Sequence, residues 1–90
     1  MRLTGQNMDY DLTQHALDVL EARRIPETWL RRVLEAAERV EPDRRDAELE
    51  HKLGRIAEHG NRVLRVVYNK TTRPIRIVTL YFDRAMRNRL

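Results

Sequence analysis

The sequence predicts an α+β fold in which two N-terminal helices pack on a three- to four-stranded antiparallel meander sheet. The first half of the chain carries apolar residues at the spacing of amphipathic helices, and the second half carries three runs with strand character. Helices therefore precede most strands, an order typical of α+β folds and unlike the alternation of parallel α/β folds. Turn residues separate the runs closely enough for consecutive strands to pair.

The length indicates a single domain over residues 1–90, because two separate cores would each hold only about 40 residues, where few chains fold unaided. The absence of cysteine excludes a disulfide scaffold, a thiolate zinc site and a cysteine nucleophile. No apolar stretch approaches the length of a membrane span, and residues 1–7 contain no apolar signal-peptide core. We therefore expect a cytoplasmic protein that does not enter a membrane.

The first elements expected are a short strand and a helix. Met8, Tyr10 and Leu12 alternate with acidic residues as in a strand, and Thr13 suits the N-cap of a helix over residues 14–23. One side of this helix carries a stripe that is expected to face the core. The stripe consists of Leu12, Ala16, Val19, Leu20 and Arg23.

A second helix is expected to begin at Pro26, whose fixed backbone torsion suits the first helical turn. Glutamates and arginines four residues apart support its outer face. Pro42 and the polar residues 43–46 are expected to end the helix and form a loop. Its inward face is apolar and comprises Trp29, Leu30, Val33, Leu34 and Ala37, with Trp29 expected in the core.

The strands that follow are bounded by turn signals. Gly60 and Asn61 favour a short hairpin, and Pro74 stands at a strand start, where a missing N–H is tolerated. Residues 83–90 are expected to be either a short helix or a basic tail. The three strands expected cover residues 49–57, 62–69 and 75–82.

The two faces of the last strand differ in character. Alternation places Thr79 and Tyr81 on one face of the sheet. If the helices cover the opposite face, these two residues line an open surface flanked by arginines. A homodimer or a partner chain covering that surface is the alternative. The face with Thr79 and Tyr81 also holds Ile75 and Ile77, and the opposite face is expected to hold Arg76, Val78, Leu80 and Phe82.

The positive charge is concentrated in the C-terminal half. Residues 1–47 carry 8 Arg against 10 Asp and Glu, a net charge of −2, whereas residues 48–90 carry 10 Arg and Lys against 4 acids, a net charge of +6. Arginine supplies 16 of the 18 cations, and its guanidinium suits bidentate contacts with phosphate or carboxylate. The pattern indicates an anionic partner; the alternative is a solvated shell rich in arginine.

These residues resemble a known family. A helix that opens with His15-Ala16 and reaches Arg23, and a last strand ending Val78-Thr79-Leu80-Tyr81, are similar to a bacterial family of domains of unknown function grouped with RelE-like toxins. The layout also resembles BrnT and RelE ribonucleases. The resemblance implies a RelE-like fold and a metal-independent endoribonuclease of a toxin–antitoxin or polymorphic-toxin system. It also implies an RNA substrate, free or on the ribosome, and a cognate antitoxin.

Four residues carry over from the family signature, with His15, Thr79 and Tyr81 as the catalytic candidates and Arg23 as an RNA contact. His15 suits proton transfer to and from RNA oxygens, and Asp18 is spaced to orient its ring; a plain boundary histidine is the alternative. Tyr81 suits base stacking or proton transfer, or caps the edge of the core. For Arg23 a structural salt bridge is the alternative.

Further candidates come from the strands. Arg55 and Arg65, followed by Arg76 and Lys52, are the cations available for phosphate, and Tyr68 joins Thr79 and Tyr81 if the strand register allows it. No cofactor or metal is expected. Glu48, Glu50 and His51 could together suggest a metal site, but Glu50 and His51 are adjacent in a strand and point to opposite faces, which argues against one metal centre. His59, in a hairpin turn, is expected to be exposed.

Two other functions compete with the nuclease. The same surface could be a protein-interaction module without chemistry, or the basic half could bind nucleic acid without regard to sequence and with a steep salt dependence. A single histidine near the expected cleft, without an aligned acid, keeps these alternatives open.

Overall fold

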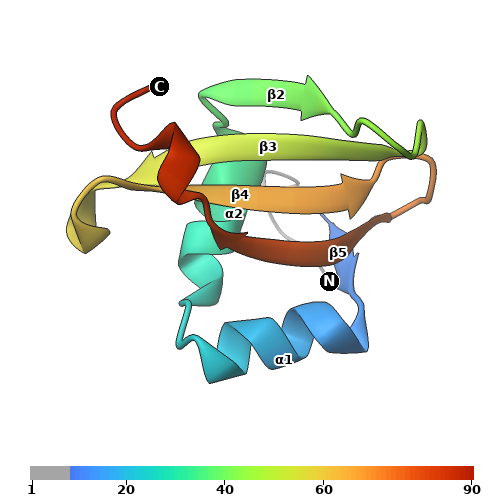
Figure 1. Ribbon diagram of the computed structural model, residues 1–90. Coiled ribbons are helices and arrows are strands. Elements are labelled where there is room, and N and C mark those ends of the chain that lie inside the picture. Colours follow the sequence, from blue (N-terminus) through green and yellow to red (C-terminus); the bar gives the residue numbers. More distant parts are fainter. Residues whose placement is uncertain (1–8) are drawn as a thin grey trace.

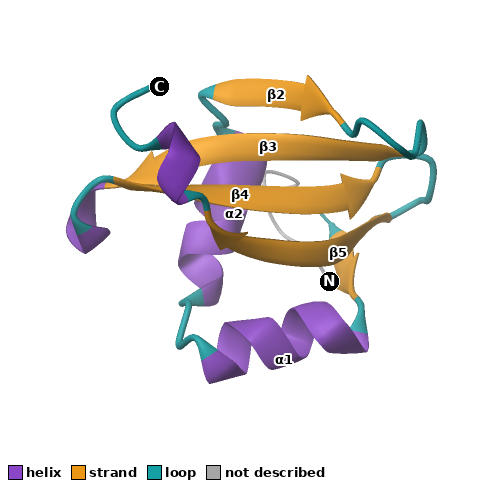
Figure 2. Cartoon of the chain, viewed as in Figure 1, coloured by secondary structure: helices purple, strands orange, loops and turns teal. Residues whose placement is uncertain are grey.

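The computed structural model describes residues 9–90, which form one five-stranded mixed sheet with two helices on one side (Figures 1 and 2). Met8, expected in the first strand, and residues 1–7, expected to contain no signal-peptide core, lie outside the described part. Among residues 9–90 no helix is long and apolar enough to cross a membrane. In chain order the elements are β1 (Tyr10–Leu12), α1 (Gln14–Ala22), α2 (Glu27–Glu35), β2 (Arg39–Pro42), β3 (Leu49–Ile56), η1 (Ala57–His59), β4 (Arg62–Asn69), β5 (Ile75–Phe82) and η2 (Arg84–Met86).

The strand order is β1-β5-β4-β3-β2, and β2 to β5 form an antiparallel meander. β1 pairs parallel to β5, with Tyr10 opposite Ile75 and Leu12 opposite Ile77. The expectation of a purely antiparallel sheet with three to four strands is therefore wrong. The physical reason is that the meander starts at the far edge of the sheet and returns to β1 with its last strand running in the same direction.

The strand β2 replaces the expected end of the second helix. α2 stops at Glu35, and the chain then turns so that the backbone N–H of Glu38 donates to the carbonyl of Leu53 at 2.8 Å. Val40 lies opposite Lys52 on β3 and is half exposed. Pro42 ends the strand at the sheet edge, where its missing N–H leaves no strand partner unpaired. An exposed edge strand needs no apolar run, and the sequence therefore gave no strand signal here.

Thr13 fixes the start of α1 against β5. Its side-chain oxygen accepts a hydrogen bond from the backbone N–H of Ala16 at 3.1 Å, which confirms the expected N-cap. The same hydroxyl donates to the carbonyl of Val78 at 3.1 Å, and the backbone N–H of Thr13 donates to the carbonyl of Ile77 at 3.1 Å. These bonds occupy the edge of β5 just beyond its pairing with β1 and bring α1 alongside that strand (Figure 1).

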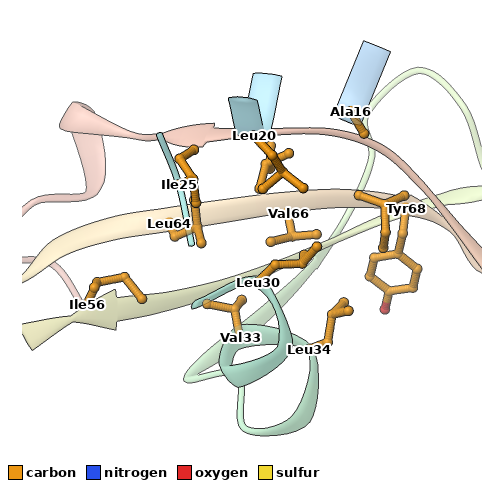
Figure 3. Close-up of a cluster of buried hydrophobic side chains, with 12 residues drawn as sticks. Ala16, Leu20, Ile25, Leu30, Val33, Leu34, Ile56, Leu64, Val66 and Tyr68 are labelled. Atoms are coloured by element: carbon orange, nitrogen blue, oxygen red, sulfur yellow. The ribbon is translucent and has the colours of Figure 1, made fainter. Parts of the chain in front are cut away.

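The core lies between the helices and the sheet, and Figure 3 shows side chains of α2 facing those of β3 and β4. The helix approaches β3 closely at Gly54, where an added Cβ would lie 3.3 Å from Val33 Cγ2. Trp29 packs against this cluster, as expected. The buried residues of the cluster are Ala16, Leu20, Ile25, Leu30, Val33, Leu34, Ile56, Leu64, Val66, Tyr68, Ile77 and Leu80.

A β-bulge in β5 changes which residues face the core. Val67 pairs with Thr79 but Tyr68 pairs with Ile77, so Val78 is an extra residue on β5. Ile77 and Leu80 are consequently both buried in the helix-side core, although simple alternation puts them on opposite faces. The expected grouping of Arg76 with Leu80 is wrong for this reason. Thr79, beyond the bulge, lies on the face opposite the helices.

The face opposite the helices is partly covered by the C-terminal segment. Residues 83–90 contain the short helix η2, which resolves the choice between a helix and a tail in favour of a short helix. The Asp83 side chain caps it by accepting from the backbone N–H of Ala85 at 3.0 Å. η2 lies against β4, in front of the sheet in the view of Figure 1, and α2 lies behind the sheet. The expected strands are confirmed to within one residue.

Candidate functional site

A cleft opens where α1 runs alongside the edge of β5. Its volume is about 460 Å³, and it is closed at one end by the start of β4 and by η2. All four residues carried over from the family signature line it, although His15 and Arg23 lie more than 50 positions before Thr79 and Tyr81 in sequence. The complete lining comprises His15, Val19, Arg23, Ile25, Arg62, Thr79, Leu80, Tyr81, Phe82 and Arg84.

His15 and Thr79 are in direct contact in this cleft. His15 Nε2 lies 3.1 Å from Thr79 Oγ1, so the β5 hydroxyl orients the imidazole presented by the first turn of α1. Asp18 does not orient the ring as expected, because its Oδ1 accepts a hydrogen bond from Gln14 Nε2 at 2.9 Å. The His15 side chain remains exposed and accessible to a ligand.

The cleft is positively charged. Arg23, Arg62 and Arg84 line it, and no carboxylate does. Within residues 9–90 none of the three forms an ion pair, so the structural salt bridge weighed for Arg23 is not found there. Arg62 Nη1 lies 3.4 Å from His59 Nε2. Unpaired guanidiniums around one cavity form a site for an anion, and phosphate is the anion that best matches their planar donors.

Tyr81 stands at the mouth of the cleft with 45% of its surface exposed. It lies opposite Arg65 in the β4–β5 register and shares the face opposite the helices with Thr79. An exposed phenol ring beside cations can stack on a nucleobase, and its hydroxyl can donate a hydrogen bond. The cleft therefore combines a proton-transfer group, an orienting hydroxyl, an aromatic ring and three cations.

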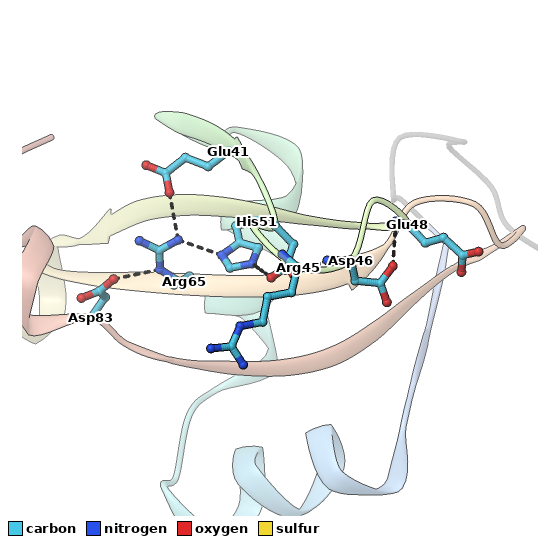
Figure 4. Close-up of polar contacts among 8 residues, drawn as sticks. Glu41, Arg45, Asp46, Glu48, His51, Arg65 and Asp83 are labelled. Atoms are coloured by element: carbon cyan, nitrogen blue, oxygen red, sulfur yellow. Dashed lines mark hydrogen bonds and ion pairs between the residues drawn. The ribbon is translucent and has the colours of Figure 1, made fainter.

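Arg65, expected to contact RNA phosphate, is engaged inside the protein. It is only 9% exposed, and it donates from Nε to Asp83 Oδ2 at 2.8 Å and from Nη1 to Glu41 Oε1 at 3.0 Å (Figure 4). Burial by itself lowers the pKa of the guanidinium, but the hydrogen bonds to Glu41 and Asp83 outweigh it and raise the pKa above its usual value. Two carboxylates thus neutralise this cation, and it is not available in the cleft.

Arg55 and Arg76 also lie away from the cleft. Arg55 donates to Glu38 from Nε at 2.9 Å and from Nη2 at 2.7 Å, and this pairing lowers the pKa of the Glu38 carboxyl. Arg76 is exposed near the start of β5, opposite Asn69, whereas the cleft lies at the end of that strand. Neither arginine lines the cleft.

Tyr68 and Lys52 occupy the helix side of the sheet. Tyr68 is 4% exposed and donates a hydrogen bond to Glu50, so it does not join Thr79 and Tyr81 on the open face. Burial, reinforced by the Glu50 contact, raises the pKa of the Tyr68 phenol. Lys52 donates to the carbonyl of Leu34 at 3.0 Å and satisfies an otherwise free carbonyl near the end of α2.

The remaining histidines have different surroundings. His51 is on the open face and Glu50 on the helix side, as alternation predicts, and no group of three or more His, Asp or Glu side chains in residues 9–90 could hold a metal ion. His59 is half-buried between Trp29 and Phe82, with ring centroids 5.4 and 4.8 Å away. The expectation that His59 is exposed is wrong because the turn folds back against α2.

The sequence reasoning missed Arg62 and Arg84 as cleft residues. Leu64 pairs with Phe82, and extending this antiparallel register by two residues brings Arg62 opposite Arg84. The signal was therefore the register of the β4–β5 hairpin. It was obscured because Arg84 lies beyond the strand, in a segment interpreted as a helix or tail.

Comparison with known proteins places the chain in a family. A family model described as a domain of unknown function, DUF4258, matches residues 12–82, which include His15, Arg23, Thr79 and Tyr81. No curated protein and no solved structure matches the chain. The matched region begins at the last residue of β1 and ends at the last residue of β5, so it contains both walls of the cleft. The chain belongs to the DUF4258 family.

Proposed function

We propose that this protein is a metal-independent endoribonuclease that cleaves RNA in the cleft between α1 and β5. The observation that carries the proposal is the convergence of an oriented histidine and an exposed tyrosine with three arginines for which residues 9–90 supply no carboxylate partner. The arginines supply binding and charge stabilisation for a phosphodiester, and the histidine and tyrosine supply groups for proton transfer.

The proposed reaction is attack of an RNA 2′-hydroxyl on its own phosphate. His15 takes the 2′-hydroxyl proton, with Thr79 holding the imidazole at Nε2 and leaving Nδ1 free to face the substrate. The bond from phosphorus to the 5′-oxygen breaks as Tyr81 donates a proton to that oxygen. Arg23, Arg62 and Arg84 stabilise the charge that builds up on the phosphorane. The products are a 2′,3′-cyclic phosphate and a 5′-hydroxyl.

The biological setting we propose is a toxin–antitoxin or polymorphic-toxin system in the cytoplasm. The resemblance of the helix with His15 and the strand with Tyr81 to RelE- and BrnT-like toxins supports it, as does the excess of positive charge in the C-terminal half. An antitoxin that covers the cleft would block RNA and would need acidic groups to meet its arginines.

The test is RNA cleavage by the purified protein in the presence of EDTA. Wild type is expected to produce fragments with 2′,3′-cyclic phosphate ends. His15→Ala and Tyr81→Phe are each expected to lower the rate about 100-fold or more, the usual contribution of a general acid or base. Arg55→Ala, which removes a cation outside the cleft, is the matched control and should cleave at the wild-type rate. Circular dichroism verifies that each variant is folded.

A second candidate is an RNA-binding module without catalysis, favoured by the absence of any second histidine or carboxylate in the cleft lining. In the same experiment, this candidate is supported if the folded wild type binds RNA but leaves it intact. Induced expression in bacteria adds a second readout, since the nuclease predicts growth arrest that His15→Ala relieves. Intact RNA and normal growth with a well-folded wild type would reject the nuclease.

A further inference from the structure

A second cavity adjoins the cleft on the face of the sheet opposite the helices. It has a volume of about 310 Å³ and lies between the β2–β3 loop, the first half of β4 and the end of β5. Tyr81 lines both this cavity and the cleft. A ligand that follows the surface from the cleft therefore passes over the Tyr81 ring and meets Arg44 and Arg45 of the loop.

The loop that carries these two arginines is held in a defined conformation. Asp43 Oδ2 accepts hydrogen bonds from the backbone N–H groups of Arg45 and Asp46 at 3.0 and 2.9 Å. Asp43 Oδ1 lies 2.8 Å from His51 Nε2, and His51 Nδ1 lies 2.8 Å from Arg65 Nη1 (Figure 4). Because a guanidinium only donates, Nδ1 is the acceptor and Nε2 carries the proton given to Asp43. The sheet thus orders the loop before any ligand arrives.

The charges of the second cavity leave two cations available. Three carboxylates line the cavity, and each has a partner there or beside it. Glu41 pairs with both Arg39 and Arg65 at 3.0 Å, Asp83 pairs with Arg65 at 2.8 Å, and Asp43 accepts a hydrogen bond from His51 at 2.8 Å. Arg44 and Arg45 are exposed and have no ion pair within residues 9–90. Figure 4 shows the Arg45 side chain reaching from the loop across the face of the sheet.

We propose that the second cavity is a phosphate subsite, and that the substrate is single-stranded RNA running from the cleft across Tyr81 to Arg44 and Arg45. This inference rests on the proposed function and specifies its substrate class. A base can stack on the Tyr81 ring only if it is free of a duplex stack, and an exposed ring between the cationic cleft and the two exposed loop arginines suits a flexible strand. Base-paired RNA would leave Tyr81 without a stacking partner.

The test measures binding with 2′-O-methyl RNA, which has no free 2′-hydroxyl and is not cleaved by the proposed reaction. Fluorescence anisotropy compares a dinucleotide with a hexanucleotide for wild type and Arg44→Ala/Arg45→Ala. The double variant is expected to lose about tenfold or more in hexanucleotide affinity. The slope of the logarithm of its binding constant against the logarithm of the salt concentration should fall in magnitude by about 1.4, or roughly 0.7 per lost phosphate contact. Tyr81→Ala is expected to weaken binding of the hexanucleotide roughly 5- to 150-fold, because it removes the ring on which a base stacks.

The matched control is Lys70→Ala/Arg73→Ala, which removes the same charge from the neighbouring β4–β5 loop but from neither cavity. It should bind the hexanucleotide within about twofold of wild type. An equal loss in both double variants, or no loss in Arg44→Ala/Arg45→Ala, would overturn the subsite. Equal affinity for the hexanucleotide and for its duplex would overturn the single-strand assignment.

The same variants separate this inference from the nuclease itself. If the length-dependent affinity depends on Arg44 and Arg45 but unmodified RNA stays intact, the subsite stands and the nuclease fails. If unmodified RNA is cleaved but the loop arginines do not matter, the nuclease stands and the subsite fails. Absence of any binding overturns both.

Discussion

The groove between α2 and β3 and the cleft between α1 and β5 both contain arginines, but only the cleft offers those arginines to a ligand. The groove between α2 and β3, of about 390 Å³, holds Arg32 and Arg55, each in a two-pronged ion pair, with Glu58 at 2.8 Å and with Glu38 at 2.7 Å. The cleft between α1 and β5, of about 460 Å³, is lined by arginines without a carboxylate. The difference teaches that folding pairs some arginines with carboxylates and leaves others open to solvent, which the number of cations alone does not show.

The ion pairs of Arg32 and Arg55 also lower the pKa values of their carboxylate partners. The hydrogen bonds that Arg32 donates lower the pKa of Glu58 to about 2, and Arg55 lowers the pKa of Glu38. A phosphate entering the groove would have to displace a carboxylate from each guanidinium, whereas in the cleft it would displace only water. The following predictions test this contrast.

The largest effect is expected where a paired arginine is also buried. Arg65→Ala removes the ion-pair partner of Asp83 in a half-buried site and leaves Glu41 paired with Arg39 alone, which should cost about 3 kcal/mol of unfolding free energy. Urea denaturation measures it. Arg76→Ala, which removes an exposed arginine that forms no ion pair with the described residues 9–90, is the control and should change the free energy by less than about 0.5 kcal/mol. Equal effects would break the distinction between paired and unpaired arginines.

The next effect concerns RNA affinity. Arg62→Ala and Arg84→Ala should each weaken binding of an uncleavable oligonucleotide roughly fivefold or more, because each removes a charged hydrogen-bond donor from the cleft. Arg32→Ala and Arg55→Ala remove the same charge from the groove and should leave the affinity nearly unchanged. Anisotropy titrations at one salt concentration compare the four variants. If all four lose affinity alike, net charge rather than pairing determines binding.

A smaller effect is expected at Tyr68 and Tyr81, which the sequence analysis grouped on the condition that the strand register allowed it. Tyr68→Phe removes the hydrogen bond to Glu50 in the core and should lower the unfolding free energy by about 1 kcal/mol without affecting RNA affinity. Tyr81→Phe keeps the exposed ring and should leave stability unchanged. Denaturation and binding, measured on both variants, sharpen the contrast between the two faces of the sheet. A loss of RNA affinity in Tyr68→Phe would contradict its burial.

The smallest effect is a pH dependence in the groove. Because the folded pKa of Glu58 is about 2 and its usual value is 4.5, the stabilisation from its pairing with Arg32 is present above pH 4.5 and lost as the pH falls through about 2. Arg32→Ala should return the pKa of Glu58 toward 4.5. Carbon-detected NMR of the carboxyl group gives both values. An unchanged pKa in the variant would show that the pair does not hold the carboxylate.

Much of the fold could be predicted because local patterns dominate it. The turn at Gly60 and Asn61 and the strand alternation define β4 and β5, and Thr13 marks the start of α1. β2 escaped prediction because an exposed edge strand ending in Pro42 carries no apolar run. The parallel pairing of β1 is a contact between residues far apart in sequence, which periodicity does not encode.

The site could be predicted only in part. His15, Thr79, Tyr81 and Arg23 do meet in one cleft, and the family resemblance selected them. Arg55 and Arg65 do not line the cleft and are ion-paired, which could not be predicted because composition shows a cation but not the carboxylate that folding brings to it. The bulge at Val78 changed which residues of β5 face the helices, and no single residue type predicts such a bulge.

The central claim is that RNA binds in the cleft between α1 and β5, and backbone NMR of the wild type with the uncleavable hexanucleotide tests it most directly. The account predicts that the largest chemical-shift changes fall on His15, Arg62, Thr79 and Tyr81. Shifts concentrated in the groove, at Arg32, Gly54 and Arg55, would contradict it.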